Sequence, residues 1–126
     1  MALTFFIGGL LAVAGILIAF LALSSVDSGY GAAAGFRAEA SATAGAEDGI
    51  LQFERNGGNF SSSTYSIVTG TSTTALVSIS QNTPSVGFDT ILSATTISGH
   101  TKKIQVVISQ NVSTGQVNVV SWADVQ

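Results

Sequence analysis

The sequence contains no cysteine and only one proline. Without cysteine, the chain has no disulfide bond and no thiolate ligand for a metal ion. Charged residues are also scarce, because Asp, Glu, Lys and Arg together make up 9% of the 126 residues. Only four residues are basic and the formal net charge is −3, which argues against binding to nucleic acid by neutralisation of phosphates. No nucleic-acid partner is therefore expected.

Few side chains are suited to catalysis. His100 is the only histidine, and because it follows Gly99 in an expected turn we interpret it as an exposed residue. Glu47 and Asp48 are adjacent, but neighbours on a helix point in different directions and do not form a catalytic pair of carboxylates. The sequence therefore predicts that the protein is not an enzyme. It assigns no catalytic, cofactor-binding or metal-binding residues and no cofactor.

One long apolar segment lies at the N-terminus. Residues 1–23 carry no charged side chain, and the first charge along the chain is Asp27. At about 1.5 Å per residue, a helix of this length spans roughly 33 Å, which matches the ~30 Å hydrocarbon core of a bilayer. We therefore expect residues 1–28 to form a first domain, a hydrophobic helix that lies in a membrane or in the core of a filament.

No basic residue precedes Arg37. A secretory signal peptide begins with a basic region, and Lys or Arg near one end of a membrane helix normally sets its orientation. We therefore expect that a basic leader once preceded Met1 and has been removed, so that Met1 is a processed N-terminus. An unusual start of the chain is the alternative.

Small residues recur along the apolar segment at spacings of three and four, which places them on one stripe where another helix can pack closely. Bulky aromatic residues near the start can fill the spaces between neighbouring helices. The residues expected to mediate assembly between helices are Phe5, Phe6, Gly8, Ala12, Gly15 and Ala19. The alternative is that small residues are simply frequent in membrane helices.

The helical pattern continues beyond the apolar segment. A polar stretch with glycines at 24–31 indicates a kinked or locally melted helix. The Ala-rich residues 32–55 have one apolar face, which is strong only at Ile50 and Phe53, so we expect the rest of the domain to pack mainly on the last three turns. The sequence thus predicts one helix over about residues 2–55.

After the Asn56-Gly57-Gly58 cluster, which is typical of a helix end, the hydrophobic period changes to that of strands. The links between the expected strands are short, which favours antiparallel neighbours. The expected strands are 64–69, 74–81, 88–98, 101–110 and 116–122. We therefore predict an α+β fold in which a small antiparallel sheet of four to five strands, within residues 63–122, packs on the helix.

The second domain is expected to comprise residues 29–126, with the amphipathic helix at 32–55. Apolar residues that alternate with polar ones along the strands should face the helix. These inward residues are Val77, Ile79, Ile104, Val106, Ile108, Val120 and Trp122. The core between helix and sheet is expected to contain Ala46, Ile50, Phe53 and Trp122.

Two triplets match the acceptor pattern for N-linked glycosylation, and they begin at Asn59 and Asn111. Such triplets are also common by chance. Lys102 and Lys103 form a small basic spot, which we interpret as a guard against pairing of sheet edges or as a subunit contact.

The apolar N-terminal helix, its Ala-rich extension, the segment AGAEDGILQFERN (Ala44 to Asn56) and the strand-rich domain together resemble a type IV pilin or pilin-like protein. The resemblance implies that a prepilin peptidase removes a leader, that the amine of Met1 is methylated, and that pilus assembly machinery moves the subunit from the cytoplasmic membrane into a filament. Pilins usually carry Glu as the fifth mature residue, whereas this chain has Phe5. We therefore expect an apolar contact at the N-terminus.

The sequence as a whole predicts a structural subunit that polymerises with copies of itself into a type IV pilus-like filament at the cell surface, where it serves adhesion or surface motility. A helix of about 50 residues leaves much apolar surface for partners to cover. Two alternatives remain open. One is a minor pilin or pseudopilin of a secretion or DNA-uptake machine, and the other is a monomeric surface-binding domain with a membrane anchor.

Overall fold

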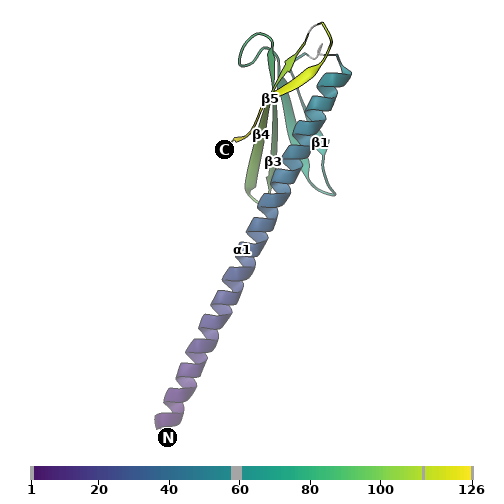
Figure 1. Ribbon diagram of the computed structural model, residues 1–126. Helices are drawn as coiled ribbons and strands as arrows, with labels where there is room; N and C mark the ends of the chain where they lie inside the picture. Colours follow the sequence, from purple (N-terminus) through teal and green to yellow (C-terminus); the bar gives the residue numbers. More distant parts are fainter. Residues whose placement is uncertain (1, 58–60, 112, 126) are drawn as a thin grey trace. The chain divides into compact units, whose positions relative to one another are not determined.

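The computed structural model describes residues 2–57, 61–111 and 113–125, and for residues 2–11 it describes the backbone alone. The described residues form a long helix, α1 (Ala2–Arg55), followed by strands β1 (Ser63–Val68), β2 (Thr74–Ser80), β3 (Phe88–Ile97), β4 (His100–Gln110) and β5 (Val117–Val125) (Figure 1). The helix packs against the antiparallel sheet, and the predicted α+β fold is confirmed.

The chain divides into two compact units, Met1–Ala33 and Ala34–Gln126. The described residues of the first unit are all helical. The second unit combines the C-terminal part of α1 with the sheet. Residues 24–31 are helical, so of the two alternatives expected for this polar stretch, a kink or local melting, local melting is wrong. Its serines and glycines lower helix propensity by at most about 1 kcal/mol each, which is not enough to interrupt the helix.

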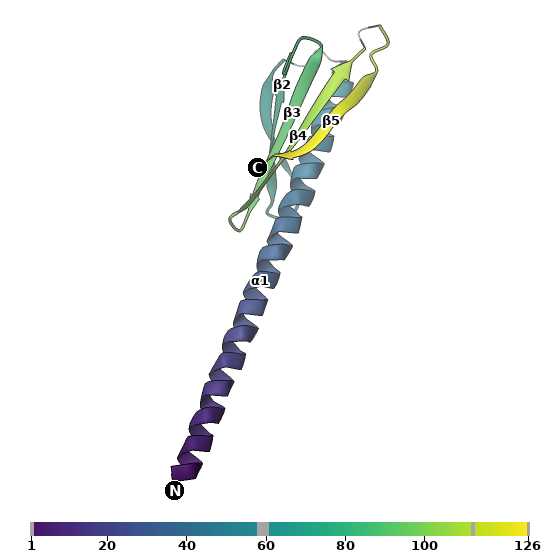
Figure 2. The ribbon, with the colours of Figure 1, turned by 60° about the vertical axis from the view of Figure 1, so that its left-hand side comes forward.

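The sheet has the strand order β1-β2-β3-β4-β5, and each strand pairs antiparallel with the next one in the sequence (Figure 2). The hairpin between β3 and β4 is an example of the short links between the strands. Ser98 and Gly99 both have positive φ angles, of 48° and 81°, while Ile97 pairs with His100. Two such residues form a tight turn whose twist matches that of the strands.

The hydrophobic core lies between the sheet and the C-terminal part of α1. Buried side chains alternate along the three central strands, as expected where one face of each strand packs on a helix. The inward positions predicted for β2 and β4 are confirmed. The core cluster consists of Ala42, Ala46, Phe53, Val77, Ile79, Ile91, Ile104, Val106 and Ile108, with Ile50, Tyr65, Ile67 and Val117 packed against it.

Small residues bring the helix close to the sheet. Ala34, Ala38, Ala42 and Ala46 are buried at four-residue spacing. A Cβ atom added to Gly49 would lie 2.6 Å from Cγ2 of Ile91, so the glycine is required for this close approach. The buried face extends from Ala34 to Phe53, which is about five turns, and the expected restriction to the last three turns is wrong. Small side chains gave a weak apolar pattern, yet the sheet covers them fully.

Strand β5 does not contribute the expected core residues. Trp122 is 43% exposed and Val120 is also exposed, so their predicted inward positions are corrected. Trp122 pairs with Val106 and therefore lies on the helix-facing side of the sheet, whereas a register shift leaves Val120 without a partner. A helix about 10–12 Å wide cannot cover five strands spaced at about 4.8 Å. The edge strand is therefore largely exposed.

Candidate functional site

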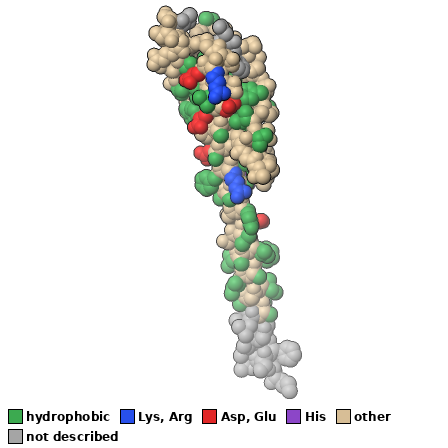
Figure 3. Space-filling model, turned by 90° about the vertical axis from the view of Figure 1, so that its right-hand side faces the viewer, with side chains coloured by type: hydrophobic (Ala, Val, Ile, Leu, Met, Phe, Trp, Pro, Cys, Tyr) green, Lys and Arg blue, Asp and Glu red, His purple; other side chains and the backbone are tan. Residues whose placement is uncertain are grey.

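The most distinctive surface of the chain is the apolar surface of the first unit. From Val13 to Tyr30, its large hydrophobic side chains are between 55% and 74% exposed, and the face shown in Figure 3 carries hydrophobic side chains along this part of the helix. The exposed residues are Val13, Ile16, Leu17, Ile18, Phe20, Leu21, Leu23, Val26 and Tyr30. Apolar surface of this extent is unfavourable in water, at roughly 25 cal/mol per Å², and requires lipid or protein to cover it.

Among the described residues, one helix is long and apolar enough to cross a membrane. The candidate span begins at Ala12 and lies near the N-terminus, and its most apolar 18 residues have a mean hydropathy of 1.8. None of its most apolar stretch is buried inside the protein. Insertion of this helix into a membrane is therefore compatible with its length and composition.

The small-residue stripe predicted for assembly is exposed wherever its side chains are described. Ala12, Gly15 and Ala19 are all exposed, and a Cβ atom added to Gly15 would meet nothing within 4 Å. Their surface is thus open for a neighbouring helix. Met1 and the side chains of Phe5 and Phe6, together with the surroundings of Gly8, lie outside the described residues.

The residues predicted for the core between helix and sheet divide into two groups. Ala46 and Phe53 are buried and Ile50 packs against the core, while Trp122 lies at the exposed edge. The sequence analysis did not identify Gly45 and Gly49, which face β3. Their four-residue spacing, in line with Ser41, is a signal that could have found them.

A network of hydroxyl groups joins the helix to the sheet on one side of this core. Ser41 is buried, and its Oγ forms hydrogen bonds with Oγ1 of Thr69 and, at 3.2 Å, with Oγ1 of Thr95. Thr69 also donates to the backbone oxygen of Thr73 over 3.4 Å. These bonds fix the loop between β1 and β2 against the helix.

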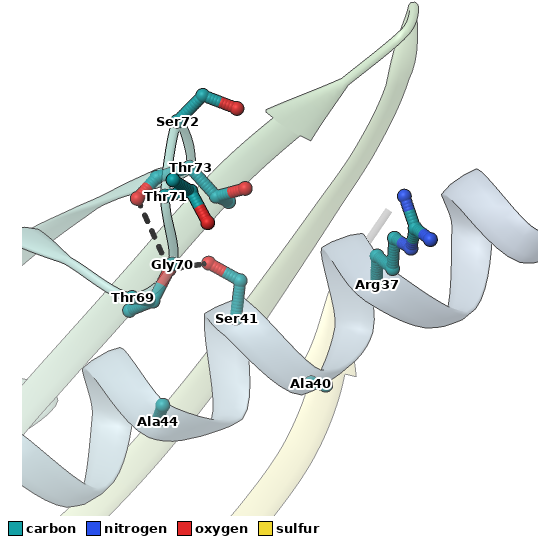
Figure 4. A pocket seen from close by; sticks show the side chains of 9 residues that line it. All are labelled: Arg37, Ala40, Ser41, Ala44, Thr69, Gly70, Thr71, Ser72 and Thr73. Carbon is teal, nitrogen blue, oxygen red and sulfur yellow. Dashed lines mark hydrogen bonds between the residues drawn. The ribbon is translucent and has the colours of Figure 1, made fainter.

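A hollow of about 470 Å³ lies beside this network (Figure 4). Its lining is made of small and hydroxyl-bearing side chains with one charged residue, Arg37; the residues are Arg37, Ala40, Ser41, Ala44, Thr69, Gly70, Thr71, Ser72 and Thr73. In Figure 4 the guanidinium of Arg37 projects from the helix and takes no part in the hydrogen bonds between Ser41 and Thr69. No carboxylate lines the hollow, so this cation lacks an acidic neighbour there.

On another part of the interface, Tyr65 donates a 2.8 Å hydrogen bond from its Oη to Oδ2 of Asp48. Burial of the phenol, followed by the hydrogen bond and charge of Asp48, raises the pKa of Tyr65 well above its usual value of 10.0. Asp48 lies about two helical turns after Ser41, so the pair ties β1 to the helix at a second point.

The basic spot predicted at Lys102 and Lys103 divides between the two faces of the sheet. Lys102 pairs with the buried Thr95 across the strands, so it lies on the helix-facing side, and its Nζ forms a 2.9 Å salt bridge with Oδ2 of Asp124. The hydrogen bond with Asp124 is the main cause of the raised pKa of Lys102, and the charge of Glu39 adds to it. Lys103 lies on the opposite face.

The remaining candidates lie apart from these features. His100 is exposed at the start of β4. In the described ranges there is no cluster of three His, Cys, Asp or Glu residues that could hold a metal ion. Asn111 is exposed, and its Oδ1 accepts hydrogen bonds from the backbone N–H groups of Ser113 and Thr114 at 2.9 and 3.4 Å. Asn59 lies outside the described residues.

Comparison of the chain with protein-family models, with curated proteins and with solved structures gave no match.

Proposed function

We propose that this chain is a structural subunit that polymerises through its apolar helix into an extracellular, type IV pilus-like filament that serves adhesion or motility. The observation that carries the proposal is the uncovered apolar surface of the first unit, from Val13 to Tyr30. In a filament, the same surface on other copies covers it. Repeated contacts of this head-to-tail kind produce open helical polymers.

The extent of the exposed apolar surface favours a polymer over a monomer in lipid. A bilayer core of ~30 Å accommodates about 20 helical residues. Residues 2–30 of the helix measure about 43 Å at 1.5 Å per residue, and Val26 and Tyr30 are exposed near the end of this length. In the second unit, Phe36 is also 72% exposed. Neighbouring helices can cover such side chains along the whole length of the helix, whereas the hydrocarbon core covers only about 20 residues of it.

Before assembly, the helix is held in the cytoplasmic membrane, which agrees with its length and hydropathy. In line with the pilin resemblance, pilus assembly machinery then transfers the subunit into the filament. The chain itself carries out no chemistry.

A membrane-anchored monomer is the second candidate, and the observation that favours it is the membrane-length helix itself. A minor pilin or pseudopilin would share the structural features of a filament subunit and differ in abundance. The location of the protein on the cell therefore separates these functions.

Electron microscopy of cells that produce the chain, with gold-labelled antibodies against the sheet, tests the proposal. Labelled filaments along their whole length are the expected result for a major subunit. Label confined to filament tips or bases would indicate a minor subunit, and a labelled cell surface without filaments would support the anchored monomer. Cells that produce the Ala12→Asp variant are the matched control, because a charge on the packing stripe should remove the filaments.

A further inference from the structure

Asp27 and Arg37 are charged residues on a helix that is apolar over most of its length. They are the first two charged residues of the chain, and the next is Glu39. Both are exposed, and neither belongs to a salt bridge in the described parts of the chain, where Lys102 and Asp124 form the pair. Glu39 differs from them, because its charge acts on Lys102 of the same chain.

The surroundings of Asp27 are those of an interface. Leu23, Val26 and Tyr30 lie about one turn or less away on the helix, and all three are exposed. When other helices cover these apolar side chains, the carboxylate is removed from water with them. A buried carboxylate without a partner is strongly unfavourable, so a cation supplied by the assembled state would stabilise it.

Arg37 is suited to be that cation. It stands at the rim of the hollow beside Ser41, whose lining contains no carboxylate, and the exposed Phe36 precedes it. A guanidinium presents a planar fork of donors that matches both oxygens of a carboxylate, and it tolerates burial in an ion pair better than an ammonium does.

The register of the helices selects Arg37 among the cations of the helix. Two parallel copies bring residues 27 and 37 together when they are offset by ten residues, which keeps more than half of their apolar segments side by side. Arg55 is the other helical cation and would require an offset of 28 residues, which would separate these segments completely. Resting on the proposed function, we infer that Asp27 of one copy forms an ion pair with Arg37 of the next copy.

Charge exchange in the full-length protein tests this ion pair. Filament yield, measured as the sedimented fraction and by electron microscopy, should fall at least tenfold in Asp27→Arg and in Arg37→Asp. The double variant Asp27→Arg/Arg37→Asp should recover most of the yield, because it restores the pair with opposite polarity. The matched control is the exchange Glu54→Arg/Arg55→Asp at the exposed end of the helix, which should leave the yield unchanged.

The absence of native cysteine allows an independent test. The double variant Asp27→Cys/Arg37→Cys, which carries neither charge, is assembled and treated with a short bis-maleimide cross-linker, because the Cα atoms of an Arg–Asp ion pair can lie farther apart than the ~7 Å that a disulfide spans. A ladder of covalently linked chains is expected. The matched controls Asp27→Cys/Arg37→Ser and Asp27→Ser/Arg37→Cys, which carry one cysteine each, should give no ladder.

The outcomes separate this inference from the proposed function. If the wild-type chain forms filaments, two results would overturn the ion pair and leave the proposed function standing. One is a normal filament yield from both single charge variants. The other is a double variant whose yield is no higher than that of the single variants. Assembled double-cysteine chains that give no ladder, or single-cysteine controls that give the same ladder, would also overturn it. Failure of the wild-type chain to form any filament would overturn both proposals.

Discussion

The Oη atom of Tyr65 lies 2.8 Å from Oδ2 of Asp48, and this hydrogen bond connects strand β1 to the helix. Tyr65 is half-buried against the hydrophobic core, so the bond is partly shielded from water. Since the acceptor is a carboxylate, the bond is stronger than one between neutral groups. Removal of this bond therefore measures how much it contributes to the attachment of the edge strand β1 to the helix.

The substitution Tyr65→Phe should lower the free energy of unfolding by about 1–2 kcal/mol, because it removes this bond and leaves the carboxylate of Asp48 without its donor. Chemical unfolding followed by the fluorescence of Trp122, the only tryptophan, measures the change. Tyr30→Phe is the matched control, since Tyr30 is highly exposed and should tolerate the loss of its hydroxyl. Equal stability of the two variants would show that the Tyr65 bond contributes nothing.

Stability should also fall at alkaline pH. The pKa of Tyr65 is raised in the folded protein above its usual value of 10.0, so above about pH 10 the unfolded chain releases a proton that the folded chain retains. The contribution of Tyr65 is therefore complete below pH 10 and is lost as the pH rises towards the higher pKa of the folded state. Unfolding midpoints between pH 8 and 11 should fall more steeply for the wild-type chain than for Tyr65→Phe. Parallel curves would contradict the assignment.

The close approach of the helix to β3 should be sensitive to a single methyl group. Gly49→Ala should destabilise the domain by about 1–3 kcal/mol, because the new Cβ would lie 2.6 Å from the branched side chain of Ile91. Gly35→Ala is the control, because a Cβ there meets nothing within 4 Å and should stabilise the helix by up to about 1 kcal/mol. Thermal unfolding by circular dichroism distinguishes the two effects, and a stabilised Gly49→Ala variant would be incompatible with this packing.

The small-residue stripe should not tolerate a charge in the assembled state. Ala12→Asp or Gly15→Asp should abolish filaments, because an unpaired charge buried between apolar helices costs several kcal/mol. Val86→Asp, at a highly exposed turn of the sheet, is the control and should assemble normally. Normal filament yield from both stripe variants would place these residues outside the helix contacts.

Removal of residues 1–28 should leave a soluble, folded domain. Every buried residue of the described core lies between Ala34 and the C-terminus, so the truncated chain keeps the whole set of core contacts. Circular dichroism should show mixed helix and strand with a cooperative thermal transition. A disordered spectrum would mean that the sheet depends on the removed residues or on assembly.

The local sequence alone determined the order and type of the elements. The uncharged residues 1–23 indicate a long apolar helix, and Asn56-Gly57 ends α1 with Gly57 at a positive φ of 58°, as expected for a left-handed cap. Alternation along β2 and β4 identified Val77 and Val106 as inward residues, because the side chains of a strand have a fixed period of two.

Only the tertiary structure decided which apolar residues are covered. Trp122 has the same alternating pattern as Val106, but the width of one helix leaves the edge strand exposed. Conversely, Gly45 and Gly49 have no apolar side chain to mark them, yet they set the distance between helix and sheet. Burial depends on which surfaces meet in three dimensions. The sequence pattern shows the hydrophobic period of each helix or strand, but it does not show how much of that element its neighbour covers.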